Sequence, residues 1–424
     1  MVKKLLLRSV ISLSIALIIS CGKSEESDGD KTVFRYNDAS GILTLDPAFS
    51  KDQSHIWICQ QLYSTLVELD SQLNIRPSVA KSWQLSEDRS TYVFTLRDNI
   101  YFNGNELHIV GNDKGVFRRK LVADDLVYSL NRLTDSKLAS PGSWIMSGVL
   151  QDETGRLTGV KALNDTTIEI RLKSPNPAFL SLLAMPYCSI VPKEVVEAYG
   201  HDFRSHPCGT GPFKLAFWKE GVRLVLHKNE YYFEKDRNGL RLPYLDAVSV
   251  SFINDKQSAF IEFLKGNLDM LSGLDPSFKD ELLTPSGNLQ PRHQGRFVLQ
   301  LQPYLNTEYL GILVDSAAQV MNGSPLLDLR IRQALSYGFD RDRMMTYLRN
   351  NVGTPGVYGM VPPGLPSFLP DSSIGYHYDP SKSKRLLADA GYLTCSSNAT
   401  PWLWRAAPQI SWAGCSTRWT KAVM

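Results

Sequence analysis

Apolar and polar residues alternate in four short stretches of the chain, and this pattern predicts four strands with one buried face each. The apolar positions are Tyr92, Phe94 and Leu96; Ile168, Ile170 and Leu172; Val222, Leu224 and Leu226; and Val248, Val250 and Phe252. Stretches with helical spacing lie between them. The element mix is therefore that of an α/β or α+β protein.

Four amphipathic helices are expected where apolar residues recur every three or four positions behind a capping or acidic residue. They run from Ser54 to Leu66, from Asp124 and Asp125 to Leu133, from Ser324-Pro325 through Leu335, and from Asp379-Pro380 to Gly391. The glycine at the end of the last helix is a typical C-terminal stop.

The first 20 residues have the pattern of a secretory leader, with basic residues before an apolar run from Val10 to Ile19 that is short for a membrane span. Ile18-Ile19-Ser20-Cys21 resembles a bacterial lipobox, in which Cys21 is lipidated and becomes the first mature residue. A plain signal peptide with an incidental cysteine is the alternative. We expect a signal peptide at 1–20, a lipidated polar tether at 21–32, and an exported lipoprotein anchored in the periplasm or on the cell surface.

Composition narrows the function classes only slightly. The 424 residues are 43% hydrophobic and 21% charged, and the net charge of +3 comes from interspersed charges, so no face for nucleic acid is expected. Five cysteines follow Cys21 without a Cys-x-x-Cys motif; we expect buried free thiols, with a Cys188–Cys208 disulfide as the alternative. No metal site and no cofactor are predicted.

Seven motifs occur in a fixed order along the chain. They are AKSWQLSEDRSTYVFTLRDNIYFNG from Ala80, VADDLVYSLNRL from Val122, PCGTGPFKL from Pro207, NEYYF from Asn229, RLPYLDAV from Arg241, SPLLDLRIRQALSYGFDRDRM from Ser324 and YDPSKSKRLLADAGY from Tyr378. Together they resemble the family 5 extracellular solute-binding proteins, the dipeptide, oligopeptide and nickel binders of bacterial ABC importers, over nearly all of residues 33–392.

The resemblance implies an α/β fold of the periplasmic-binding-protein type (type II, cluster C): a bilobed receptor with an extra inserted lobe. On this basis lobe I comprises 33–72 and 175–273, lobe II comprises 73–174, and 274–392 form a partial lobe III. It also implies a binding function and no enzymatic activity. The expected partners are an oligopeptide or dipeptide and the ABC permease subunits, with the receptor itself a monomer.

In the family, main-chain groups of a loop after the first strand hold the peptide backbone. This loop maps onto Ala39, Ser40 and Gly41, and an ordinary turn is the alternative for these residues. Three other functions stay open: the same receptor class with a nickel chelate, haem or sugar as ligand, a secreted hydrolase, or a non-functional truncated product.

Other polar clusters are interpreted as structural. Gly209-x-Gly211 lacks the Gly-Lys-Ser/Thr sequence of a phosphate loop, and these glycines are expected to let the backbone turn into a strand. His201, Asp202, Ser205 and His206 lack the context of a hydrolase or zinc motif and are expected in a solvated loop. The alternating charges from Asp340 to Arg343 are expected to lie in solvent.

The family pattern stops after Tyr392. The 31 residues from Thr394 hold four of the eight tryptophans, two of the six cysteines and no Asp or Glu. We expect a frameshift that leaves the C-terminal lobe incomplete and 393–424 as an atypical tail, with a natural short variant carrying an aromatic partner-binding tail as the alternative. The family groups that pair with the peptide termini usually lie beyond this point, so no counterpart is named.

Overall fold

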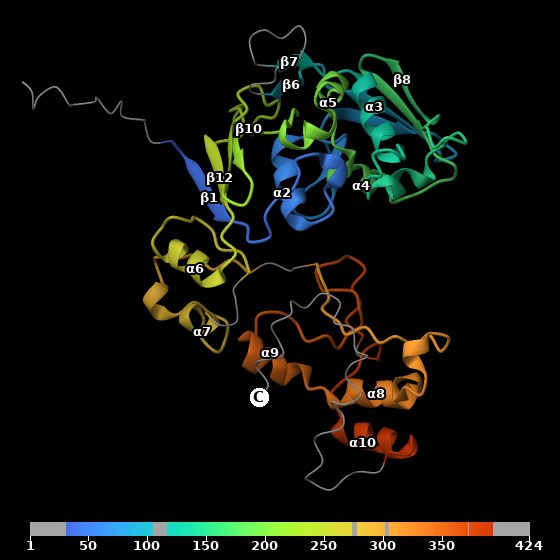
Figure 1. The fold of residues 1–424 in the computed structure, drawn as a ribbon, viewed down its shortest axis with the longest axis vertical. Helices are drawn as coiled ribbons and strands as arrows, with labels where there is room; N and C mark the ends of the chain where they lie inside the picture. Colours follow the sequence, from blue (N-terminus) through green and yellow to red (C-terminus); the bar gives the residue numbers. More distant parts are fainter. Residues whose placement is uncertain (1–30, 105–116, 274–277, 302–304, 372, 393–424) are drawn as a thin grey trace, which may run out of the picture. The chain divides into compact units, whose positions relative to one another are not determined.

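The computed structural model describes residues 31–104, 117–273, 278–301, 305–371 and 373–392. The chain divides into two compact units, unit 1 up to Ser272 and unit 2 from Gly273 (Figure 1). All strands of the described residues lie in unit 1. No helix among these residues is both long and apolar enough to cross a bilayer.

Unit 1 contains two four-stranded sheets. The first joins, in spatial order, β1 (Val33–Asn37), β12 (Ala247–Ser251), β11 (Arg223–Lys228) and β10 (Phe213–Lys219). Only the β1–β12 pair is parallel. The second sheet is antiparallel and joins β4 (Ala80–Leu85), β5 (Thr91–Leu96), β9 (Thr167–Arg171) and β8 (Val160–Asn164). Two hairpins are separate: β2 (Val67–Leu69) with β3 (Ile75–Pro77), and β6 (Tyr101–Gly104) with β7 (Phe117–Lys120).

The alternating pattern predicted four of these strands correctly, namely β5, β9, β11 and β12. Their apolar positions are buried, because one face of each strand packs into the core, except that Val222 is 54% exposed. Val222 lies just before β11, while Leu172 and Phe252 lie just beyond the ends of β9 and β12.

The helices of unit 1 lie between strands in the chain, except for the last one, α6, which follows β12. They are α2 (Gln53–Leu62), α3 (Ala123–Thr134), α4 (Phe179–Leu183), α5 (Lys193–Tyr199) and α6 (Lys256–Leu264), with 3₁₀ helices η2 (Pro47–Phe49), η3 (Ser143–Gly148), η4 (Pro186–Cys188) and η5 (Gly200–Ser205). The prediction for α3 is confirmed: it buries Leu126, Leu130 and Leu133, and it packs against β8 and β9 (Figure 1).

Two details of α2 were predicted wrongly. Its cap is Asp52, whose carboxylate accepts the His55 N–H at 3.1 Å, and Ser54 already lies inside the helix. An aspartate two residues earlier offers the same capping acceptor as the serine. The helix ends at Leu62, so Leu66 is buried in the core beyond the helix.

Unit 2 consists of short helices and irregular chain. Its helices are α7 (Lys279–Leu282), α8 (Leu329–Gly338), α9 (Arg341–Arg349) and α10 (Pro380–Asp389), with 3₁₀ helices η6 (Pro291–His293), η7 (Gln319–Met321) and η8 (Pro325–Leu327). The prediction for α10 is confirmed, with Asp379 as its cap and Gly391 at φ +87° after its end. It packs against α8 (Figure 1).

The single helix expected from Ser324 is wrong. Ser324 caps only the short η8, and Asp328 in extended conformation interrupts the chain and caps α8 through the Arg330 N–H at 2.8 Å. An aspartate that bonds its own backbone competes with helix continuation. The lobe boundaries expected from the resemblance stay predictions.

Candidate functional site

The loop after β1 forms a tight turn that exposes main-chain groups. The Asp38 N–H donates to the Ser251 carbonyl at 2.9 Å, and the Asp38 carboxylate accepts the Ser40 N–H at 3.0 Å. Gly41 has φ +72°, a conformation that favours glycine, and no atom lies within 4 Å of where its Cβ would be. Within the described chain, the carbonyls of Ala39, Ser40 and Gly41 accept no hydrogen bond.

The turn is therefore both an ordinary turn and an open row of acceptors. Ala39 and Ser40 are exposed, and Gly41 is half-buried. The positive φ of Gly41 favours glycine at this position. The open space beside it is compatible with the expected close approach of a ligand to its backbone. Cys21, the predicted lipidation site, lies outside the described residues.

The two glycines of the Gly-Thr-Gly-Pro motif serve close packing and have no positive φ. A Cβ on Gly209 would lie 2.1 Å from the Leu62 carbonyl oxygen, and one on Gly211 would lie 2.5 Å from the Leu62 carbonyl carbon. The prediction that these glycines form a sharp turn is therefore wrong. They allow the backbone to pack closely against the end of α2. The Gly211 N–H donates to the Leu62 carbonyl at 3.1 Å, which fixes the strand entry on that helix end.

The asparagine of the NEYYF motif, Asn229, contacts the Gly-Thr-Gly-Pro motif that precedes it in the chain. It is buried, and its side-chain amide donates to the Gly211 carbonyl at 2.8 Å. Its Oδ1 accepts from Asn103 Nδ2 at 2.9 Å and from the Tyr231 N–H at 3.0 Å. Asn103 could not be predicted from the sequence, because a single asparagine on a strand has no distinguishing pattern.

The polar cluster at 201–206 has no catalytic geometry. It forms the 3₁₀ helix η5, a correction to the expected loop, and His201 lies in solvent. His206 stacks on Tyr199 at 4.0 Å between ring centroids, and its Nδ1 lies 2.9 Å from the Asp202 carbonyl. Among the described residues, no group of His, Cys, Asp and Glu has the geometry of a metal site.

The cysteines of the described chain are buried free thiols, as expected, and Cys188 and Cys208 are not paired. Burial raises the pKa of Cys59 and that of Cys188 to about 12, and it raises the pKa of Cys208 well above the ordinary value of a thiol. Cys395 and Cys415 lie outside the described residues. These thiols are therefore packed as small apolar groups.

Arg341 corrects the expectation for the charge run of 340–343. Its guanidinium is partly buried and donates to the Ser336 carbonyl at 3.0 Å, and burial lowers its pKa. Asp340 caps α9 through the Arg343 N–H at 2.9 Å. Two of the four charges thus support local structure.

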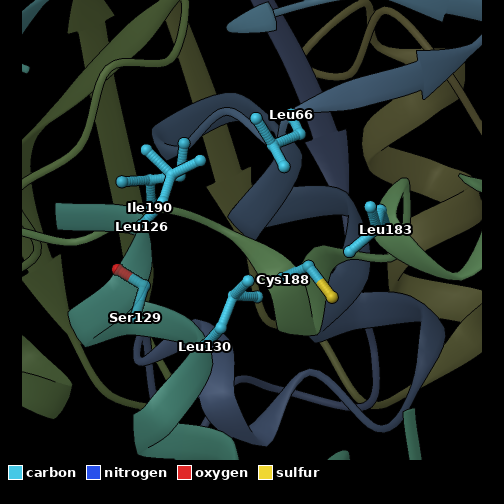
Figure 2. A pocket seen from close by; sticks show the side chains of 7 residues that line it. All are labelled: Leu66, Leu126, Ser129, Leu130, Leu183, Cys188 and Ile190. Atoms are coloured by element: carbon cyan, nitrogen blue, oxygen red, sulfur yellow. The ribbon is translucent and has the colours of Figure 1, made fainter. Parts of the chain in front are cut away.

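A small apolar pocket inside unit 1 is part of the core. Figure 2 shows its lining residues: Leu66, Leu126, Ser129, Leu130, Leu183, Cys188 and Ile190. The space is too narrow to admit a water molecule, and the Ser129 hydroxyl is bonded to the Asp125 carbonyl at 2.6 Å. The pocket is a gap in the packing and offers no ligand site.

The family model described as "Bacterial extracellular solute-binding proteins, family 5 Middle" matches residues 74–400. The chain belongs to this family. The resemblance of the ordered motifs is thereby confirmed, and so is the fold class of a type II periplasmic binding protein. The family is a class of binding proteins.

Three individual proteins illustrate the similarity. "Heme-binding protein A" of Haemophilus influenzae is 28% identical over 88% of this chain and 64% of its own length. "Glutathione-binding protein GsiB" of Shigella flexneri is 25% identical over 83% of this chain and 60% of its own length. The structure of a periplasmic oligopeptide-binding protein (OppAIV) from Borrelia burgdorferi matches with a TM-score of 0.66 and 25% identity, over 87% of this chain and 68% of that one. The chain thus spans less than two thirds of the two curated relatives.

Proposed function

We propose that the chain binds an oligopeptide or dipeptide and presents it, unconverted, to the permease of an ABC importer. The observation that carries this proposal is the turn Ala39–Gly41, whose three successive carbonyls lack partners in the described chain. Main-chain acceptors recognise a peptide backbone whatever its side chains are. The similar Borrelia burgdorferi protein, named as oligopeptide-binding, supports the ligand class.

A ligand other than an ordinary oligopeptide or dipeptide is the second candidate for this receptor class. Haem and glutathione are favoured by the names of the two curated relatives. Glutathione shares the backbone amides of a peptide, so the turn could hold it in the same way. Haem offers two carboxylates, which the carbonyls of Ala39–Gly41 would not attract, because both are hydrogen-bond acceptors.

Calorimetry of the purified chain (residues 22–424) tests this function. We expect heat of binding with a mixture of di- to pentapeptides and intact peptide on mass analysis afterwards, and no comparable heat with haem. Recovery of cleaved peptides would show that the protein is a hydrolase and would refute the receptor function. Heat with haem alone would keep the receptor class and refute the peptide.

A pair of glycine variants isolates the turn. Gly41 and Gly221 both have positive φ (+72° and +67°) and open space where a Cβ would be. Gly41→Ala and Gly221→Ala therefore carry a similar backbone cost of about 1–2 kcal/mol. We expect only Gly41→Ala to weaken peptide binding. Equal affinities of the two variants would remove the turn from the binding surface.

We further propose that Cys21 carries a lipid anchor that holds the receptor at the membrane. The motif Ile18-Ile19-Ser20-Cys21 supports this. Labelling cells with an alkyne fatty acid is expected to tag the full chain and to leave the Cys21→Ser variant untagged. Equal labelling of both would contradict it.

A further inference from the structure

Leu43 is an exposed apolar side chain next to the proposed binding turn. It is 74% exposed, more than any other large apolar residue described in unit 1. The preceding residue, Ile42, is only 1% exposed, so the side chain of Ile42 is buried in the core and that of Leu43 lies in solvent. Single exposed leucines are common on protein surfaces, and exposure alone carries no conclusion.

The main chain of Leu43 is held from two sides. Its N–H donates to His55 Nε2 at 3.4 Å, and its carbonyl accepts from Arg204 Nη1 at 3.2 Å. The Leu45 N–H adds a bond to the Arg204 carbonyl at 2.8 Å. The segment that follows the turn is thus fastened to α2 and η5.

The two groups that hold Leu43 are themselves oriented by carboxylates. His55 Nδ1 lies 2.6 Å from Asp52 Oδ1, so this nitrogen carries the proton and Nε2 is left to accept. Arg204 Nη1 also donates to Glu220 Oε1 at 2.7 Å. The backbone at Leu43 is therefore preorganised, while its side chain has no packing role in unit 1.

We infer that Leu43 is a specificity residue, which contacts an apolar side chain of a peptide whose backbone lies on Ala39–Gly41. This inference rests on the proposed peptide-binding function. This apolar group follows the open carbonyls by two residues, and the backbone that carries it is held before binding, so less main-chain entropy is lost on contact. The contact raises the affinity for peptides with an apolar side chain at this position, because that side chain is buried on binding, and it does not change the affinity for polar peptides.

The test compares trileucine with triserine by calorimetry on wild-type protein, Leu43→Ser and Leu43→Met. A control is Leu163→Ser, which removes another exposed leucine of unit 1. We expect Leu43→Ser to weaken trileucine binding roughly five- to tenfold, in line with partial loss of a buried leucine contact. Triserine binding, the Leu43→Met variant and the Leu163→Ser control should stay close to wild type.

The outcomes separate this inference from the proposed function. Wild-type protein that binds neither peptide refutes peptide binding and removes the basis of the inference with it. Peptide binding that Leu43→Ser leaves unchanged overturns the inference alone. An equal loss for both peptides overturns it too, because that result would show that Leu43 shapes the loop without reading the ligand.

Discussion

Replacing Asn229 by alanine is expected to lower the free energy of unfolding of unit 1 by about 2–4 kcal/mol. The side chain is 1% exposed and makes three hydrogen bonds, to Gly211, Asn103 and Tyr231. A typical bond contributes about 0.5–1.5 kcal/mol net, and each buried partner left unsatisfied adds a desolvation cost. The three bonds act on one site, so their contributions are coupled.

Hydrogen exchange measured by mass spectrometry on the amides of β10 and β11 reports this change locally. We expect these amides to exchange faster in Asn229→Ala by the factor that corresponds to the lost free energy. Asn254→Ala is the matched control, because Asn254 is exposed and should change stability by less than about 0.5 kcal/mol. Exchange in Asn229→Ala that equals exchange in the control would refute the reasoning.

Three further predictions concern packing, charge and thiols. Gly211→Ala should destabilise unit 1 more than Gly221→Ala in thermal unfolding, because its Cβ would lie 2.5 Å from backbone of α2, and equal melting temperatures would contradict this. Burial, and then the nearby Glu234, raise the pKa of Glu68 to about 7, although Arg76 Nη2 lies 2.6 Å from its Oε1. The folded protein therefore holds a proton that the unfolded chain releases near the ordinary pKa of 4.5, so Glu68 lowers stability as the pH rises from there to about 7. Glu68→Gln should flatten this loss in urea titrations across that range, and an unchanged pH slope would exclude Glu68 as its cause. Cys59, Cys188 and Cys208 should react with a thiol reagent at pH 8 only after unfolding, because burial raises their pKa values; fast labelling of these three residues in the native protein, located by peptide mapping, would contradict this.

The strands with strict alternation could be predicted from the sequence, because burial of one face imposes a period of two on the residues. β5 and β12 are examples. The charged start of α3 was also predicted, but not the part Asp125 plays there. This carboxylate is buried and pairs with Arg119, which lies six residues earlier. Sequence spacing does not reveal such a pair, because the turn between the two residues decides whether they meet.

The roles of single capping residues and glycines could not be predicted from the sequence. Asp52 and Ser54 both could cap α2, and only the backbone conformation decides between them. The glycines of the Gly-Thr-Gly-Pro motif read as turn residues, while the structure uses them for contact with Leu62. That contact joins residues about 150 positions apart in the sequence. The entropy cost of closing such a loop changes little with its length, so sequence separation does not indicate which distant residues meet.

The turn Ala39–Gly41 could be located from the family resemblance, but its open carbonyls could not. Asp38 bonds the N–H groups of the turn, and the three carbonyls accept no hydrogen bond within the described chain. Whether a ligand occupies them depends on groups that a single loop does not contain.

Mass spectrometry of the ligand that co-purifies with the chain, under native conditions and then after denaturation, tests the central claim most directly. The account predicts adducts with the masses of short peptides, released intact on unfolding and reduced in Gly41→Ala but not in Gly221→Ala. Haem or another non-peptide mass in place of peptides would contradict it.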